Sequence, residues 1–219
     1  MQEFQFQRTD NERWKGMIML HLGGKNTGKS TFTAEQVKKW LKRGKGVVVY
    51  DRIGHDYWKS IPVLTFDQLK TWDNKGIVRV TDPDVYAFCQ AVFDRIRNAL
   101  VVYDDCTPYF KGSLPKVVED MLLQSRNYCN DFFLNAHSIR QIAPVVILNA
   151  DIVILRNTYE NPKHLPAEKC DAELLGKYLA DIQDENLEKY PSINGKKVPQ
   201  LSYRIIDLLS AYSGARTKI

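Results

Sequence analysis

Residues 17–31 read MIMLHLGGKNTGKST: an apolar run leads into a glycine-rich loop, and an amphipathic segment follows. From Gly23 to Ser30 the spacing is Gly, four residues, Gly, Lys, Ser, which is typical of a phosphate-binding loop, or P-loop. The run 18–22 predicts a buried strand, and residues 33–41 carry apolar side chains at helical spacing. The stretch therefore predicts a strand, a P-loop and a helix, in that order.

Each fixed position of this loop has a physical role toward phosphate. Gly23 and Gly28 allow a backbone whose N–H groups point inward at phosphate oxygens, which a Cβ would obstruct. Lys29 supplies a positive charge to the β and γ phosphates, and the Ser30 hydroxyl is a hard oxygen ligand for Mg²⁺. We therefore expect ATP and Mg²⁺ as cofactors. The residues predicted to bind the nucleotide are Gly23, Gly24, Lys25, Asn26, Thr27, Gly28, Lys29, Ser30 and Thr31.

Two adjacent carboxylates follow a second apolar run. Residues 99–103 read ALVVY and predict a buried strand, and Asp104 and Asp105 come directly after it. Because ligands gather at the carboxyl ends of parallel strands, we expect Asp104 to hold Mg²⁺ through a water. We expect Asp105 to polarise an attacking water, which favours hydrolysis over phosphoryl transfer to a substrate. The alternative for Asp105 is a turn or a helix cap.

The next predicted strand, residues 132–134, ends in polar side chains. Asn135 and His137 follow it directly. If this strand lies between the P-loop strand and the strand that ends at Asp104, its tip faces the γ-phosphate. A hydrogen-bonding side chain there can sense the phosphate or orient water, and His137 is the first candidate and Asn135 the second. Capping of the loop is the open alternative for both.

The whole chain has the composition of an ordinary globular protein. It has 219 residues, of which 44% are hydrophobic and 26% charged, enough for one α/β domain with decoration. No apolar run approaches the length of a membrane span, and we expect a cytoplasmic protein. Of 31 Lys and Arg and 26 Asp and Glu, nine of each follow Asn157, which leaves 22 and 17 before it. This basic excess is compatible with a polyanionic partner.

Strands and helices alternate along the chain, which predicts a mainly parallel sheet with helices on both faces. We expect Asp82 to cap a helix that has Pro83 at its first position. Residues 1–156 are predicted to form the nucleotide-binding core, and residues 157–219 an extension packed on the core or at a subunit interface. The remaining expected strands are 47–51, 77–80 and 151–156, and the remaining expected helices are 66–72, 84–97, 115–128 and 172–188.

Three motifs resemble those of the FtsK/HerA group of P-loop ATPases, which includes viral genome-packaging ATPases and Zot-like phage proteins. They are GGKNTGKST at 23–31, VVYDDC at 101–106 and SRNYCNDFFLNAHS at 125–138. The resemblance covers residues 17–156 and implies a RecA-like fold with the strand order 5-1-4-3-2. Members carry Glu where this chain has Asp105, and they commonly carry Gln as a sensor where it has His137.

The resemblance also implies an arginine finger that reaches the nucleotide of a neighbouring subunit. Arg126 matches the position of this finger, just before the sensor strand, and Arg140 and Arg156 are reserve candidates. A salt bridge from Arg126 to Asp131 or Glu119 is the alternative.

The compact size of the chain is similar to that of viral packaging ATPases. This resemblance implies a homo-oligomeric ring that threads double-stranded DNA, with a capsid or portal contact and a place in the host cytoplasm or on the virion. Aromatic and basic residues at 109–111 are candidates for contacting DNA.

Two other functions remain open. The first is a P-loop small-molecule kinase, although the chain has no dense arginine cluster for a lid and does have the adjacent carboxylate pair. The second is a Zot-like assembly protein that binds ATP and moves little DNA. A GTPase is disfavoured because no NKxD motif for reading the base is present.

Overall fold

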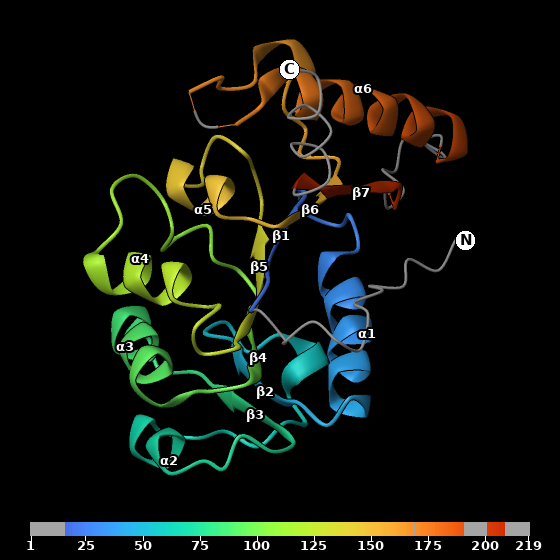
Figure 1. Cartoon of the computed structure of the whole chain (residues 1–219). Helices are drawn as coiled ribbons and strands as arrows, with labels where there is room; N and C mark the ends of the chain where they lie inside the picture. The colour runs from blue at the N-terminus through green and yellow to red at the C-terminus, as the bar shows by residue number, and fades with distance from the viewer. Residues whose placement is uncertain (1–15, 169, 191–200, 209–219) are drawn as a thin grey trace.

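The computed structural model describes residues 16–168, 170–190 and 201–208. In this part of the chain a seven-stranded sheet has the order β3-β2-β4-β5-β1-β6-β7 (Figure 1). All neighbouring strands are parallel except β6 and β7, which are antiparallel. The strands are β1 (Ile18–Leu22), β2 (Gly46–Tyr50), β3 (Ile77–Val80), β4 (Ala99–Tyr103), β5 (Asp131–Ala136), β6 (Ile152–Arg156) and β7 (Tyr203–Asp207).

Helices cover both faces of the sheet (Figure 1). On one face, Val37 and Trp40 of the first helix pack on apolar residues of the sheet. On the other face, a larger core includes Phe88, Val118 and Val146, each from a different helix. The helices are α1 (Lys29–Lys42), α2 (Phe66–Lys70), α3 (Val85–Arg95), α4 (Lys116–Leu123), α5 (Pro144–Leu148) and α6 (Ala172–Lys189), with the short 3-10 helices η1 (Asp56–Trp58) and η2 (Pro162–His164).

The central strands are buried along their whole length, which explains their sequences. Every residue of β2, GVVVY, and of β4, ALVVY, is buried. A parallel sheet covered on both faces favours continuous runs of β-branched and apolar residues instead of alternation. The predicted α/β class, with a mainly parallel sheet and helices on both faces, is therefore confirmed.

The predicted strand order 5-1-4-3-2 is wrong for the sheet as a whole. It allows five strands, whereas the observed sheet adds β3 outside β2 at one edge and β7 outside β6 at the other. Strand β5, which contains Asn135 and directly precedes His137, nevertheless lies between the P-loop strand and the strand that ends at Asp104, because it pairs with β1 on one side and with β4 on the other. The order was inferred from resemblance alone, and edge strands depend on pairing partners that are distant in the sequence.

Several element boundaries differ from the sequence-based predictions. Helix α3 is capped by Asp84, whose carboxylate accepts the backbone N–H groups of Tyr86 and Ala87, and not by Asp82. Asp82 instead accepts the N–H of Asp84 at 2.9 Å, so it forms the turn before the helix. Helix α4 ends at Leu123, well before residue 128. Strand β5 extends through Asn135, which is therefore a strand residue and not a loop residue.

The C-terminal part of the chain extends the sheet of the core. Strand β7 pairs with β6 from Ile152 opposite Asp207 to Arg156 opposite Tyr203. Helix α6 contributes buried apolar residues, among them Leu179, to the larger core. An ion pair of 2.7 Å between Glu185 of α6 and Arg204 of β7 connects the helix to the strand. The division of the chain at residue 156 stays a prediction. None of the helices in the described ranges has the length and apolarity that a bilayer crossing needs.

Candidate active site

The P-loop connects β1 to α1, and its glycines are required by its shape. Gly28 has a φ of 83°, in the left-handed region that favours glycine. A Cβ on Gly24 would lie 2.2 Å from the ring of Tyr159, and one on Gly23 would lie 2.7 Å from the hydroxyl of Thr27. No side chain caps the first turn of α1, so its amide groups are available to an anion. The loop therefore fits a phosphate ligand.

Lys29 is buried, and its ammonium donates to backbone carbonyls of its own loop. Nζ lies 2.5 Å from the carbonyl oxygen of Gly23 and 2.9 Å from that of Gly24. Burial lowers the pKa of Lys29 to about 8, against an opposing effect of Asp105 and then Asp104. The side chain is thus still charged at neutral pH and lies beside the carboxylate pair.

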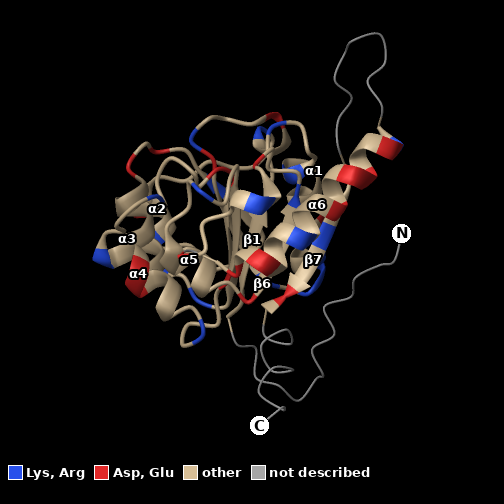
Figure 2. Cartoon of the chain, turned by 90° about the horizontal axis from the view of Figure 1, so that it is seen from above, with Lys and Arg blue, Asp and Glu red and all other residues tan. Residues whose placement is uncertain are grey.

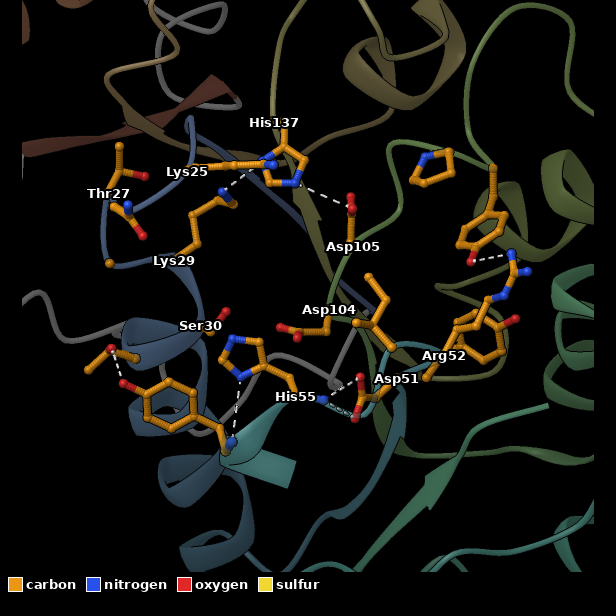
Figure 3. A pocket seen from close by; sticks show the side chains of 18 residues that line it. Lys25, Thr27, Lys29, Ser30, Asp51, Arg52, His55, Asp104, Asp105 and His137 are labelled. Carbon is orange, nitrogen blue, oxygen red and sulfur yellow. Dashed lines mark hydrogen bonds and ion pairs between the residues drawn. The ribbon is translucent and has the colours of Figure 1, made fainter. Parts of the chain in front are cut away.

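His137 lies between the P-loop lysine and the second carboxylate, and Figure 3 shows the three side chains in a row. The Nδ1 atom of His137 is 3.2 Å from Lys29 Nζ, and its Nε2 atom is 3.3 Å from Asp105 Oδ2. Because an ammonium can only donate, Nδ1 accepts in this contact, and Nε2–H then donates to the carboxylate. The backbone N–H of His137 donates to the hydroxyl of Thr107, which holds the main chain from which the ring projects.

The two carboxylates differ in environment. Burial raises the pKa of Asp104 above its ordinary value. Burial alone would also raise the pKa of Asp105, but the hydrogen bond from His137, together with hydrogen bonds from Thr107, lowers it below its ordinary value. The backbone N–H of Thr107 donates to Asp105 Oδ1 at 3.0 Å. Asp105 is therefore an ionised, well-oriented acceptor at neutral pH.

Asn135, the second sensor candidate, is completely buried beneath the site. Its Nδ2 donates to Asp104 at 3.3 Å, and its Oδ1 accepts the hydroxyl of Thr33 at 3.1 Å. Asn135 thus connects the end of β4 to helix α1. His137, in contrast, lines the cavity above the P-loop. The choice of His137 as sensor stays a prediction.

The cavity has a volume of about 460 Å³, and the residues that line it include Lys29, Asp104, Asp105 and His137. Sequence analysis did not identify the loop after β2 as part of it, although Asp51 stands at the carboxyl end of a predicted strand. Asp51 accepts the N–H groups of Gly54 and His55, and Tyr57 shares a hydrogen bond of 2.7 Å with the hydroxyl of Thr31. Figure 3 shows His55 beside Ser30 and Asp104, the residues predicted to hold Mg²⁺.

The three arginine candidates lie in different places. Arg126 pairs with Asp151 at 2.7 Å, so the alternative partners Asp131 and Glu119 are wrong. Both residues precede strands, at the edge of the sheet opposite the P-loop, and the side chain of Arg126 is 54% exposed. Arg140 is exposed and donates to the carbonyl of His164. Arg156 is only 4% exposed and contacts its own P-loop, so it is unsuitable as a finger for a neighbour.

Of the residues at 109–111, Tyr109 and Lys111 stay predictions as contacts with DNA. Phe110 is completely buried in the core, so its place in this prediction is wrong. Tyr109 accepts a hydrogen bond from Arg52 at 3.3 Å, and Lys111 is exposed. The pattern of aromatic residues followed by a lysine at 109–111 is therefore compatible both with a surface loop and with a segment that packs into the core.

No protein-family model matches the chain, and no curated protein sequence matches it significantly. Similar solved structures include the genome packaging NTPase B204 of Sulfolobus turreted icosahedral virus 2 with ATPγS (19% identity, 89% of this chain, 93% of that chain, TM-score 0.65). The same NTPase with AMPPCP has 18% identity, 90% and 95% coverage, and a TM-score of 0.65. B204, the DNA-packaging ATPase of Sulfolobus turreted icosahedral virus, has 19% identity, 89% and 93% coverage, and a TM-score of 0.60. At these identities the chain shares their fold over most of its length.

Proposed function

We propose that this chain is an ATP-hydrolysing, DNA-translocating motor of the FtsK/HerA type that packages a viral genome. The observation that carries the proposal is the row of contacts from Lys29 through His137 to Asp105, which joins the P-loop to the carboxylate pair in one cavity. The fold shared with B204, itself a genome packaging NTPase, supports the same assignment.

The donor set at the cavity fits ATP with Mg²⁺. The amides of the P-loop and the Lys29 ammonium would hold the phosphates. The Ser30 hydroxyl and the Asp104 carboxylate are oxygen ligands of the kind that Mg²⁺ prefers, and a cation would favour the ionised form of Asp104 that burial disfavours. When bound, Mg²⁺ would neutralise charge on the β and γ phosphates.

Hydrolysis then depends on where the water proton goes. Asp105 is placed to accept the proton of a water that attacks the γ-phosphorus, while the bond to the ADP oxygen breaks. His137 contacts Asp105 through Nε2–H and Lys29 through Nδ1. When Lys29 moves to bind phosphate, His137 would therefore transmit that movement to the base, Asp105. Lys29 would exchange its bonds to the carbonyls of Gly23 and Gly24 for bonds to phosphate.

The proposed partners are double-stranded DNA, further copies of this chain in a ring, and a capsid or portal, in the host cytoplasm or on the virion. Charge of both signs lies along α6 (Figure 2), so this helix does not account for a basic DNA-binding surface. The basic excess before Asn157 is the charge that we assign to DNA.

Double-stranded DNA is expected to raise the steady-state ATPase rate of the full chain, and the stimulation should weaken as salt rises, because phosphate contacts release counterions. The measurement is phosphate release with and without DNA, at several salt concentrations, beside the oligomeric mass from light scattering. Transfer of phosphate to a nucleoside or sugar would instead establish a kinase. ATP binding by an oligomer without DNA stimulation would favour an assembly protein.

A mixture of Arg126→Ala and Lys29→Ala chains is expected to regain ATPase activity that neither variant has alone. In a ring, a site built from Lys29 of one subunit and Arg126 of the next is intact at roughly a quarter of the interfaces of a random equal mixture. The measurement is the ATPase rate after the two variants are mixed, with mixed oligomers verified by mass. Arg95→Ala, which removes an exposed arginine on α3, is the matched control and should keep full activity. Mixed rings without any regained activity would rule out the finger in trans.

A further inference from the structure

Arg156 lies at the end of β6, outside the lining of the cavity, and contacts three parts of the chain, one of which is the P-loop. Its Nη1 donates to the carbonyl of Thr27 in the P-loop at 2.6 Å and to the carbonyl of Leu201 at 3.0 Å. Its Nε donates to Nε2 of His21 on β1 at 2.8 Å. The P-loop, the sheet and the segment that leads into β7 are thus held by one side chain.

The guanidinium also lies against two aromatic rings, which contact each other. Its central carbon is 4.7 Å from the ring centre of Tyr203 on β7 and 5.4 Å from that of Phe32 on α1. Such contacts stabilise a cation without neutralising its charge. Burial lowers the pKa of Arg156 to about 10, which still leaves the group charged at neutral pH.

No carboxylate in the described ranges forms an ion pair with this buried cation. Buried charges are usually paired, because desolvation of an isolated charge is costly. His21 does not compensate: burial, then the charge of Arg156, keeps its pKa well below the ordinary value, so the ring stays neutral.

A second buried cation lies close by without a direct carboxylate contact. Lys29 donates to two carbonyls and to His137, and the charge of Arg156 contributes to lowering its pKa. Two positive charges therefore contact the same loop: Lys29, which lines the cavity, and Arg156, which is not among the residues that line it. An anion cradled by the loop would balance both, and phosphate is the anion that a P-loop fits.

We infer that Arg156 is a positioning residue for nucleotide phosphate: it fixes the P-loop through the Thr27 carbonyl, adds a second positive charge in contact with the loop, and connects the loop to β7. The inference rests on the proposed function. It gives the C-terminal segment a role at the site, because Leu201 and Tyr203 hold the same guanidinium that holds the loop.

Arg156→Met, which keeps the bulk and removes the charge, is expected to weaken binding of Mg·ATPγS by about tenfold or more, since a unit charge in contact with the loop is lost in a medium of low dielectric. The KM for ATP should rise by a similar factor with a much smaller change in kcat. Arg156→Lys, which restores the charge, should recover part of the affinity. Binding is measured by titration calorimetry on the full-length chain, and KM and kcat by phosphate release.

Two controls separate this role from a merely structural one. Arg95→Met makes the same exchange at an exposed arginine and should bind as the wild type does. Tyr203→Leu removes one aromatic contact and keeps Arg156, so it should raise the KM by a smaller factor, and it serves as the test if Arg156→Met fails to fold. A variant that simply unfolds in part would lose kcat at an unchanged KM.

Wild-type binding by Arg156→Met, or a lower kcat with an unchanged KM, would overturn the inference and leave the proposed function standing. If the wild-type chain neither binds Mg·ATPγS nor hydrolyses ATP, the proposed function itself fails and the inference fails with it.

Discussion

A Lys29→Ala variant is expected to abolish ATP hydrolysis, with a loss of at least about a hundredfold, the usual cost of removing one group that stabilises transition-state charge. Lys29 is the only lysine side chain of the P-loop that lies buried against its carbonyls and beside His137. Lys25, the other lysine of the loop, also lines the cavity, but its side chain is exposed. The measurement is the steady-state ATPase rate of the purified variant.

The loss should not arise from unfolding. Lys29 is a buried cation that donates to carbonyls and a histidine but pairs directly with no carboxylate among the described residues, so its removal relieves a desolvation cost. The melting temperature is therefore expected to stay close to that of the wild type. Lys38→Ala, an exposed lysine on α1, is the matched control and should keep full activity. Unchanged turnover in Lys29→Ala would exclude the P-loop as the hydrolytic site.

Asp105→Asn is expected to stop hydrolysis while ATP binding remains largely intact. His137 and Thr107 contact different oxygens of the carboxylate, so the single oxygen of the amide can accept from only one of them, and the amide cannot take a proton from water. Loss of a general base typically reduces the rate by about a hundredfold to ten-thousandfold. Single-turnover hydrolysis gives the rate, and titration with Mg·ATPγS gives the affinity.

Asp94→Asn is the matched control, because Asp94 is an exposed aspartate outside the cavity lining whose carboxylate accepts a hydrogen bond from Gln90 at 2.9 Å. It should leave both rate and affinity unchanged. If Asp105→Asn loses nucleotide binding together with hydrolysis, Asp105 holds the loop or the metal and is not the base. Asp105 would then share the role proposed for Asp104.

Local patterns predicted much of the fold. The runs that form β1, β3 and β4 were predicted with the observed bounds, because strands of a covered parallel sheet are continuous apolar runs. The ends of helices were predicted less well. Asp82 and Asp84 both match a cap in composition, and only the backbone path after Pro83 decides which carboxylate reaches the amides of α3.

The predicted site was more complete for residues in sequence motifs than for residues outside them. The P-loop and the carboxylate pair could be found because their spacing alone defines the chemistry. The loop from Asp51 to Tyr57 has no such spacing, and it reaches the cavity only because β2 lies beside β4. Phe110 is the opposite case: its sequence context predicted a surface residue, but its side chain is completely buried in the core.

The sequence by itself determined the strand, phosphate loop and helix at the start of the fold and the acidic end of β4, because these depend on residues that are neighbours along the chain. Only the tertiary structure decided what surrounds them. Lys29 and His137 are 108 residues apart, and Arg156 is 129 residues from Thr27. Such contacts arise because β1 is hydrogen-bonded between β5 and β6, and that pairing depends on how the whole sheet packs. The P-loop thus predicts a phosphate site, and the pairing of the sheet decides which groups lie on either side of it.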